Sequence, residues 1–445
     1  MKFRACFLRL TFFLGLAIVL EASGIAASVN PRTLTQHPKS RGVTENQHAK
    51  KRMHALARSR APRSTVAHAS AGHGSAVHTS AVHASVIPAT AGGSSGVRYT
   101  STRSSSTRHH YYERFYTSSF ASDVTEGDVT AGEDPVVRQA AIDALGNMNG
   151  TVVAIEPTSG RILAMVNQKL ALSSGAQPCS TIKLTVALAA LSEGLIDKET
   201  EVSLGSRSRM NLTEALAHSN NAYFEAVGRK LGFEKVHYYA QQFGLGELAG
   251  YHILGEQLGT YPEEEISAKL GGVSKMCSFG EGISMTPLQL GALVTAISNG
   301  GTLYYLQHLT NPVEVANFQP RVKRHLDIEP VIPELSDGMA GAVAYGTARS
   351  VRLNFNEESI LGKTGTCSHA GTRFGWFASY ANTDIGRIVT VVFLQGGRPT
   401  FGPKAAEIAG RMYRNLYDHN FFVAGAGTTL AAPGLEKVST SATPQ

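Results

Sequence analysis

A continuous apolar run, residues 184–191, lies near the middle of this 445-residue chain. Leucines within it recur at helical spacing, which predicts a buried helix. Pro178 suits a position just outside a helix start, and Gly194 indicates the stop. We therefore expect Ser180 at the N-terminus of this helix, with Lys183 one turn further along the same face.

A serine followed by a lysine at this spacing is a nucleophile with a candidate base. A neutral lysine amine can take the proton of the serine hydroxyl, and the helix N-terminus favours the negative charge that develops. The same pattern also fits a capping serine followed by a surface lysine. The rest of the chain has to decide between these interpretations.

The formal net charge of +7 is unevenly distributed. Residues 29–120 hold thirteen Lys and Arg against two acids, a net charge of +11, and residues 1–28 add +2. Residues 121–445 therefore carry a net charge of −6. A basic segment attached to a mildly acidic domain is not the charge pattern of a nucleic-acid binder, so we expect no nucleic-acid partner.

Residues 1–27 have the features of an export signal: a positive start, an apolar stretch over residues 10–20 and small residues over 22–27. The apolar stretch is shorter than the roughly 20 residues that cross a bilayer, and Glu21 ends it. We expect a cleaved signal peptide, with a retained anchor in the cytoplasmic membrane as the alternative. Both place the folded part outside the cytoplasm, in a periplasm or at a cell surface.

Residues 28–133 are predicted to be a basic, disordered linker rich in Ser, Ala and His, because large apolar residues are scarce there. Within it a five-residue repeat places a histidine at positions 68, 73, 78 and 83. Imidazoles on a flexible chain can bind zinc or copper. We favour a low-complexity linker and expect no metal site. Residues 426–445 are predicted to be a second disordered tail.

One folded domain is predicted over residues 134–425. A hairpin is expected from two strand-like runs joined by the turn at residues 157–160. The expected elements are a helix at 136–145, strands at 150–156 and 161–166, a helical region from 180 to about 296, strands at 360–366, 374–380 and 388–394, and a closing helix that includes 412–417. Strands at both ends with helices between them predict an α/β protein, in the α+β sense, with an antiparallel sheet flanked by helices and an inserted all-helical region.

Three short motifs follow one another along this domain. Ser180-Thr-Ile-Lys183 is S-x-x-K, residues 219–221 are S-x-N in a break between two helical stretches, and residues 363–365 are K-T-G on a strand. Together they resemble the penicillin-recognising serine acyltransferases, which comprise penicillin-binding proteins and serine β-lactamases. The resemblance implies the β-lactamase/transpeptidase-like fold.

The resemblance covers about residues 135–420. The opening hairpin, residues 279–301 and Trp376-Phe377 are similar to penicillin-binding-protein transpeptidase domains, and they separate that family from β-lactamases. Two positions depart from the pattern: Cys179 stands where glycine is usual, and Leu184 where proline is usual. Neither departure removes a reacting group.

The resemblance implies a catalytic role for five residues. Ser180 would attack the peptide carbonyl, and Lys183 would be its base with a lowered pKa. Ser219 would relay a proton to the leaving amine, and Asn221 would orient Lys183 or the substrate amide. Lys363 would lower the pKa of Lys183 as a second cation.

The K-T-G strand would bind the substrate. Lys363, Thr364 and Thr366 would hold the substrate carboxylate, and the peptide would lie along residues 363–366, Gly365 included, as an added strand. The backbone N–H groups of Ser180 and Thr366 would form the oxyanion hole. No cofactor is implied.

The resemblance implies a D,D-transpeptidase that cross-links peptidoglycan stem peptides ending in D-Ala-D-Ala. β-Lactam antibiotics and a cell-wall synthesis complex would be further partners. D,D-carboxypeptidase and β-lactamase are the alternatives; the latter would need a deacylating glutamate, for which Glu263, Glu264 and Glu265 are the candidates, although their surroundings look like a cleft loop. A non-catalytic penicillin sensor or wall-binding module is the alternative of another class.

Three cysteines follow the expected signal, which itself contains Cys6. Cys179 precedes the nucleophile and Cys367 lies just beyond the K-T-G motif, so a bond between them is geometrically conceivable. However, if Thr366 points into the cleft, strand alternation turns Cys367 away from it. We therefore expect three free thiols, with one disulfide pair and one leftover thiol as the alternative.

Overall fold

The computed structural model describes residues 114–205, 207–382 and 387–424. The expected signal, the histidine repeat and the C-terminal tail lie outside these residues. Within the described ranges, no helix has both the length and the apolar composition that a membrane span requires.

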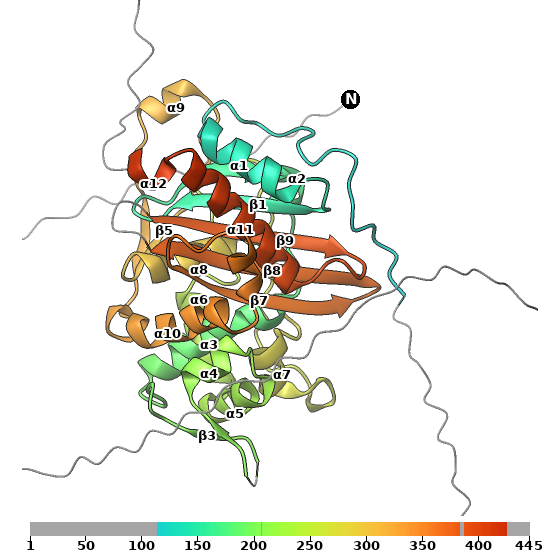
Figure 1. Ribbon diagram of the computed structural model, residues 1–445. Coiled ribbons are helices and arrows are strands. Elements are labelled where there is room, and N and C mark those ends of the chain that lie inside the picture. Colours follow the sequence, from blue (N-terminus) through green and yellow to red (C-terminus); the bar gives the residue numbers. More distant parts are fainter. Residues whose placement is uncertain (1–113, 206, 383–386, 425–445) are drawn as a thin grey trace, which may run out of the picture. The chain divides into compact units, whose positions relative to one another are not determined.

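A five-stranded antiparallel sheet forms the centre of the domain, in the order β2-β1-β9-β8-β7 (Figure 1). Its strands are β1 (Gly150–Glu156), β2 (Arg161–Val166), β7 (Ile360–His369), β8 (Thr372–Asn382) and β9 (Arg387–Gly396). The predicted hairpin and the three late strands are thereby confirmed. β7, which carries the K-T-G motif, is an edge strand of this sheet.

Both faces of the sheet are covered by helices. Val152 and Ala154 of β1 belong to a core cluster with residues of α1 (Pro135–Leu145) and α11 (Gly402–Asp418). Val153 and Ile155 belong to a second cluster, with residues of α3 (Lys183–Ser192) and α8 (Pro287–Ser298). Because alternate side chains of a strand point to opposite faces, a strand covered on both sides is apolar throughout. This arrangement explains the unbroken apolar pattern of β1 and confirms the predicted fold class.

The helical region after β2 contains more than helices. Its helices α3, α4, α5 and α7 lie below the sheet in Figure 1. The region also includes a small β3–β4 hairpin, and no helix is present between Phe243 and Ser267. Its elements are α2 (Gln168–Ala171), η1 (Cys179–Ile182), α3 (Lys183–Ser192), β3 (Val202–Ser203), β4 (Arg209–Met210), α4 (Leu212–Ala217), α5 (Asn221–Leu231), α6 (Phe233–Gln242), η2 (Ala268–Leu270), α7 (Gly272–Phe279) and α8 (Pro287–Ser298). The expectation of a purely helical insertion is therefore corrected in these two places.

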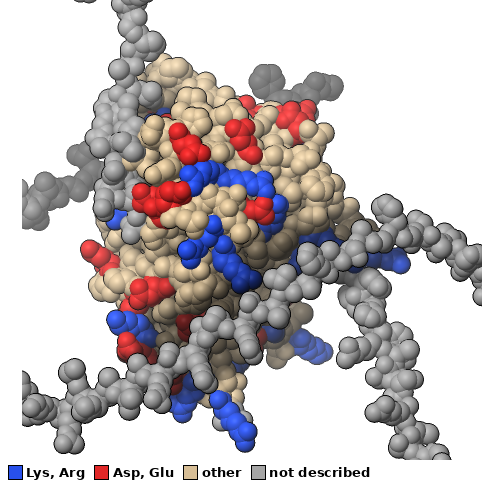
Figure 2. All heavy atoms as spheres, in the orientation of Figure 1, with Lys and Arg blue, Asp and Glu red and all other residues tan. Residues whose placement is uncertain are grey.

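The remaining elements connect this region back to the sheet. They are β5 (Thr302–Tyr304), α9 (Pro312–Ala316), β6 (Val322–His325), η3 (Glu329–Val331), α10 (Ile332–Ala344), η4 (Arg349–Leu353) and, after α11, α12 (Phe421–Ala424). Basic and acidic side chains lie beside one another over much of the face in Figure 2. On α11, for example, Glu407 forms ion pairs with both Lys404 and Arg411.

Residues 114–133 belong to the folded part, which corrects the expected linker boundary. The backbone N–H of Tyr116 donates to the carbonyl of Gly371 at the tip of the β7–β8 hairpin. Further along, Asp128 and Glu133 pair with Arg138, and both carboxylate side chains are only 1% exposed. Composition alone suggested a linker because polar contacts hold most of this segment, and Val124 is its one buried hydrophobic side chain in the core clusters.

Candidate active site

The nucleophile segment is built as predicted, with one refinement. A short 3-10 turn, η1, carries Ser180 and runs directly into α3, which ends before Gly194. Cys179 has φ = 51°, in the left-handed region that favours glycine. This backbone conformation gives a physical reason for glycine as the usual residue at the position.

Lys183 points at Ser180 from inside the protein. Its Nζ lies 2.9 Å from Ser180 Oγ, 2.6 Å from Asn221 Oδ1 and 2.8 Å from the carbonyl oxygen of Ser219. The side chain is fully buried. Burial, together with the nearby charge of Lys363, lowers the pKa of Lys183 to about 6. Near neutral pH this amine is therefore mostly unprotonated, as a general base must be.

Ser219 stands between the two lysines. It lies between α4 and α5 with φ = 54°, and its hydroxyl accepts from Lys363 Nζ at 2.8 Å and from Lys183 Nζ at 3.2 Å. The next residue, Asn220, caps α5 by accepting from the N–H of Tyr223. This cap ends the break between the helices and so fixes Ser219 in place. Burial lowers the pKa of Lys363 to about 7.

Gly365 lets the K-T-G strand approach the nucleophile segment closely. A Cβ added to it would lie 2.9 Å from the carbonyl oxygen of Pro178 and 3.2 Å from Cγ2 of Thr181. Trp376, opposite Gly365 on β8, donates from Nε1 to the carbonyl of Gln177 at 3.0 Å. The chain before Ser180 is thus held against β7 and β8.

A disulfide joins Cys179 to Cys367, with the two Cα atoms 5.6 Å apart. The prediction of three free thiols is therefore wrong; Cys277 is the free, buried cysteine of the described residues. The prediction assumed that Thr366 faces the cleft. In the structure Lys363, Gly365 and Cys367 share the face of β7 that meets η1, so alternation brings Cys367 toward Cys179 rather than away from it.

Thr364 and Thr366 point to the other face of β7. The Thr364 hydroxyl lies 2.7 Å from that of Thr347, and the Thr366 hydroxyl accepts from the N–H of Gly402 at 2.7 Å, at the start of α11. Both hydroxyls therefore already have partners within the protein. Their expected contact with a substrate carboxylate stays a prediction.

The three motifs are thus in contact with one another, and this agrees with a comparison of whole sequences. A sequence model described as the penicillin binding protein transpeptidase domain matches residues 150–417. The chain belongs to this family.

Named relatives of this transpeptidase-domain protein are similar at modest identity. Stage V sporulation protein D of Bacillus subtilis is 28% identical over 316 residues, which cover 59% of this chain and 48% of the relative. Peptidoglycan D,D-transpeptidase MrdA of Acinetobacter baumannii is 24% identical over 345 residues, which cover 60% of this chain and 51% of the relative. The matched part thus spans about half the length of these two relatives.

Solved structures support the fold of the transpeptidase domain. A D,D-transpeptidase domain of a peptidoglycan glycosyltransferase from Eggerthella lenta superposes with a TM-score of 0.53 at 20% identity, covering 64% of this chain and 82% of that one. Pseudomonas aeruginosa PBP2 gives a TM-score of 0.53 at 21% identity, covering 67% and 80%. At these identities the likeness shows the fold alone.

Sequence reasoning on this transpeptidase domain missed two contacts that shape the site. Trp376 was noticed only as part of the resemblance, whereas its indole holds the carbonyl of Gln177. The disulfide was only the alternative to the expected three free thiols. The sequence did contain a signal for the disulfide. Lys363 was expected in the cleft, and Cys367 follows four residues later on the same strand, so both side chains lie on the same face.

Proposed function

We propose that this protein is a serine D,D-transpeptidase that cross-links peptidoglycan stem peptides through an acyl-enzyme on Ser180. The observation that supports it most directly is the 2.9 Å contact between Ser180 Oγ and a buried Lys183 whose pKa is lowered to about 6. A surface lysine would be protonated at neutral pH and could not accept the serine proton. The names of the relatives point to the same reaction.

Acylation would use the groups in contact. Neutral Lys183 takes the hydroxyl proton of Ser180 while Oγ attacks the carbonyl carbon of the penultimate D-Ala. The C–N bond to the terminal D-Ala then breaks, and a proton delivered through Ser219 leaves with its amine. Ser219 is suited to this relay because its hydroxyl lies between the two lysine amines.

Deacylation would reverse these roles. The amine of a second stem peptide attacks the acyl carbonyl and gives its proton to the Lys183 amine, directly or through the Ser219 hydroxyl. The bond between the acyl carbon and Ser180 Oγ then breaks, and the Lys183 ammonium returns the proton to Oγ. The oxyanion would be held by the backbone N–H groups of Ser180 and Thr366, and loss of one such donor typically costs about 2.7–4 kcal/mol of barrier. Lys363 would attract the carboxylate of the substrate, and Asn221 would hold Lys183 in position through its 2.6 Å contact.

Carboxypeptidation is the alternative in which water replaces the acceptor amine. β-Lactamase activity is less well supported, because two of the three glutamates considered for it contact other groups and none is hydrogen-bonded to Lys183 among the described residues. Glu265 accepts from the N–H of Val273, Glu263 lies 3.6 Å from His237, and the hydrogen bonds of Lys183 to described residues include no glutamate. We further propose that the domain works outside the cytoplasm, with β-lactams as inhibitors and a cell-wall synthesis complex as partner.

Labelled penicillin followed by intact mass over time tests this proposal. We expect a long-lived adduct of one penicillin on the wild-type protein and none on Ser180→Ala. Ser192→Ala, a change in the same helix, is the matched control and should label as wild type does. Labelling of Ser180→Ala would refute the assignment, and rapid loss of the adduct would indicate a β-lactamase. Product analysis with a D-Ala-D-Ala peptide, with and without an amine acceptor, separates transpeptidase from carboxypeptidase.

A further inference from the structure

The proposed function, on which this inference rests, fixes the side from which the acceptor amine approaches the acyl-enzyme. The attacking amine takes the place of the amine that left, because the two half-reactions pass through the same arrangement of groups in opposite directions. The departing D-Ala has its carboxylate at Lys363 and receives its proton through Ser219. The acceptor therefore has its amine beside Ser219, and the rest of the acceptor peptide extends past the point where the departing D-Ala ended.

A cavity of about 790 Å³ opens on this side of the K-T-G strand. Thr347 lines it, and the hydroxyl of Thr347 lies 2.7 Å from that of Thr364, the residue after Lys363. His218, the residue before Ser219, lines the same cavity. The cavity therefore borders both the K-T-G strand and the segment that carries the relay serine.

The wall of this cavity is attached to the helix that leads to the relay serine. Residues 344–353, which follow α10 or end it, supply most of the lining. The N–H of Thr347 donates to the carbonyl of Ala217, the last residue of α4, at 3.0 Å. The hydroxyl of Tyr345 donates to Glu214 of the same helix at 2.7 Å. The cavity and the relay serine are thus held in a fixed relation to each other.

Two arginines make the lining of this cavity cationic. Arg349 and Arg352 are both exposed, and neither forms an ion pair with a carboxylate in the described part of the chain. The Arg352 guanidinium donates to Asn356 Oδ1 at 3.0 Å and to a backbone carbonyl at 3.2 Å. The described lining includes no acid, and the neighbouring Glu214 contacts His218 at 3.3 Å rather than the arginines. Two cations without a carboxylate partner favour an anionic ligand.

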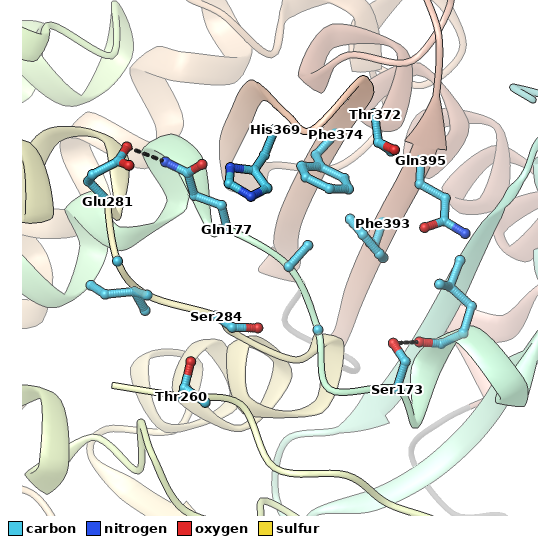
Figure 3. Close-up of a pocket in the computed structure, with 15 residues that line it drawn as sticks. Ser173, Gln177, Thr260, Glu281, Ser284, His369, Thr372, Phe374, Phe393 and Gln395 are labelled. Carbon is cyan, nitrogen blue, oxygen red and sulfur yellow. Dashed lines mark hydrogen bonds between the residues drawn. The ribbon is translucent and has the colours of Figure 1, made fainter. Parts of the chain in front are cut away.

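The cavity at the other end of β7 has the opposite charge (Figure 3). It has a volume of about 470 Å³ and is lined by His369, the last residue of β7. Glu281 is the acid of its described lining, which includes no Lys or Arg. A peptide with free carboxylates would be repelled there. Charge thus distinguishes the two ends of the site and favours the end at Arg349 for an anionic acceptor.

We propose that the cavity at Arg349 and Arg352 binds the acceptor peptide through a free carboxylate that lies beyond its attacking amine. Both guanidinium groups contact this carboxylate while the amine lies beside Ser219. Ion pairs between exposed groups are individually weak, so the two together favour a free over an amidated carboxyl group by about two- to thirtyfold. The cavity therefore selects the acceptor strand by the amidation of its carboxyl groups.

The partition of the acyl-enzyme between water and an added amine tests this proposal. A thioester analogue of the donor peptide acylates Ser180, and the acyl group then passes to water or to a synthetic peptide amine. Two acceptors of the same sequence carry the carboxyl group beyond the amine either free or amidated. In wild type the ratio of transferred to hydrolysed product should be about two- to thirtyfold higher with the free carboxyl group. This ratio does not depend on the acylation rate, because both products arise from the same acyl-enzyme.

Variants of the two arginines assign the preference to this cavity. The double variant Arg349→Gln, Arg352→Gln should use both acceptors equally, and the double variant Arg349→Glu, Arg352→Glu should favour the amidated one. Arg229→Gln, which changes an exposed arginine of α5 outside the cavity, should keep the preference of wild type. Equal use of the two acceptors by wild type would overturn the proposal, and so would a preference that survives in both double variants.

Penicillin labelling of the same samples keeps this result separate from the proposed function. If Ser180 is acylated and both acceptors are used equally, only the present inference fails. If the acyl group passes to water alone with either acceptor, the transpeptidase assignment fails together with the inference. If nothing acylates Ser180, the proposed function fails as a whole.

Discussion

Replacing Lys183 by methionine should abolish acylation and, near neutral pH, make the protein more stable. Methionine has a similar length and no charge to bury. The amine of Lys183 is held with a pKa of about 6, far below the usual value of 10.5. Between these two values the unfolded chain binds a proton at residue 183 that the folded chain does not bind, so the wild-type lysine favours unfolding.

The size of this effect depends on pH. At pH 7.5 protonation stabilises the unfolded wild-type chain by about 4 kcal/mol, since 1.36 kcal/mol corresponds to one pH unit. Methionine removes this stabilisation of the unfolded chain. It also leaves Ser180, Ser219 and Asn221 without the amine as a hydrogen-bond partner, which lowers the stability of the folded chain by about 1–3 kcal/mol. We expect a net gain of about 1–3 kcal/mol at pH 7.5. The gain should shrink by about 1.4 kcal/mol for each pH unit up to pH 10.

Urea unfolding at several pH values measures this difference. Trp376 is the single tryptophan of the chain and is fully buried, so its fluorescence reports unfolding. The decisive quantity is the slope of the stability difference between variant and wild type against pH, because lost hydrogen bonds change this difference equally at every pH. A difference between variant and wild type that is independent of pH, or that grows as pH rises, would show that Lys183 is not neutral in the folded protein. Ser192→Ala serves as the pH-independent control.

Three further predictions concern the site and its borders. The penicillin acylation rate of wild type should rise with pH through about 6 as Lys183 loses its proton; a rate that falls over this range, measured by rapid quench, contradicts its role as base. Reduction of the Cys179–Cys367 disulfide should lower that rate, and a denatured chain lacking residues 1–113 should show one thiol before reduction and three after it. A chain beginning at residue 114 should keep its acylation rate and stability. A chain beginning at residue 134 should have a free energy of unfolding lower by about 3–5 kcal/mol, measured in urea, since Arg138 is left buried without its partners. Equal stabilities of the two chains would contradict this reasoning.

The sheet and the nucleophile helix could be predicted because their signals are local. The hairpin of β1 and β2 has two strand-forming runs and a turn between them, and the structure places both strands at the predicted bounds. The helix after Ser180 has leucine spacing and a terminating glycine. Such patterns depend on neighbours within a few residues, which the sequence displays directly.

Contacts between distant segments were harder to predict. The face of β7 on which each side chain lies was predicted by placing Thr366 in the cleft. In the structure the Thr366 hydroxyl instead meets the start of α11. That choice reversed the expected direction of Cys367. Similarly, residues 114–133 have few apolar side chains, and their anchoring depends on Arg138, which is brought near only by folding. In each case the deciding partner lies on another element, so composition and spacing do not reveal it.

The pairing of β1 with β9 makes the order of synthesis important for this protein. Gly150 and Leu394 are register partners although 244 positions separate them, so β1 has only β2 as a neighbour until almost the whole domain has been made. Proteins dominated by such distant pairings fold slowly. Among the three cysteines of the folded domain, Cys277 lies between Cys179 and Cys367 in sequence, so during this delay it is the domain's first available partner for Cys179. Within the domain, oxidation before β7 has been made can join only Cys179 and Cys277, and this bond must later be exchanged. Correct assembly therefore requires either late oxidation or a thiol that reshuffles the bond.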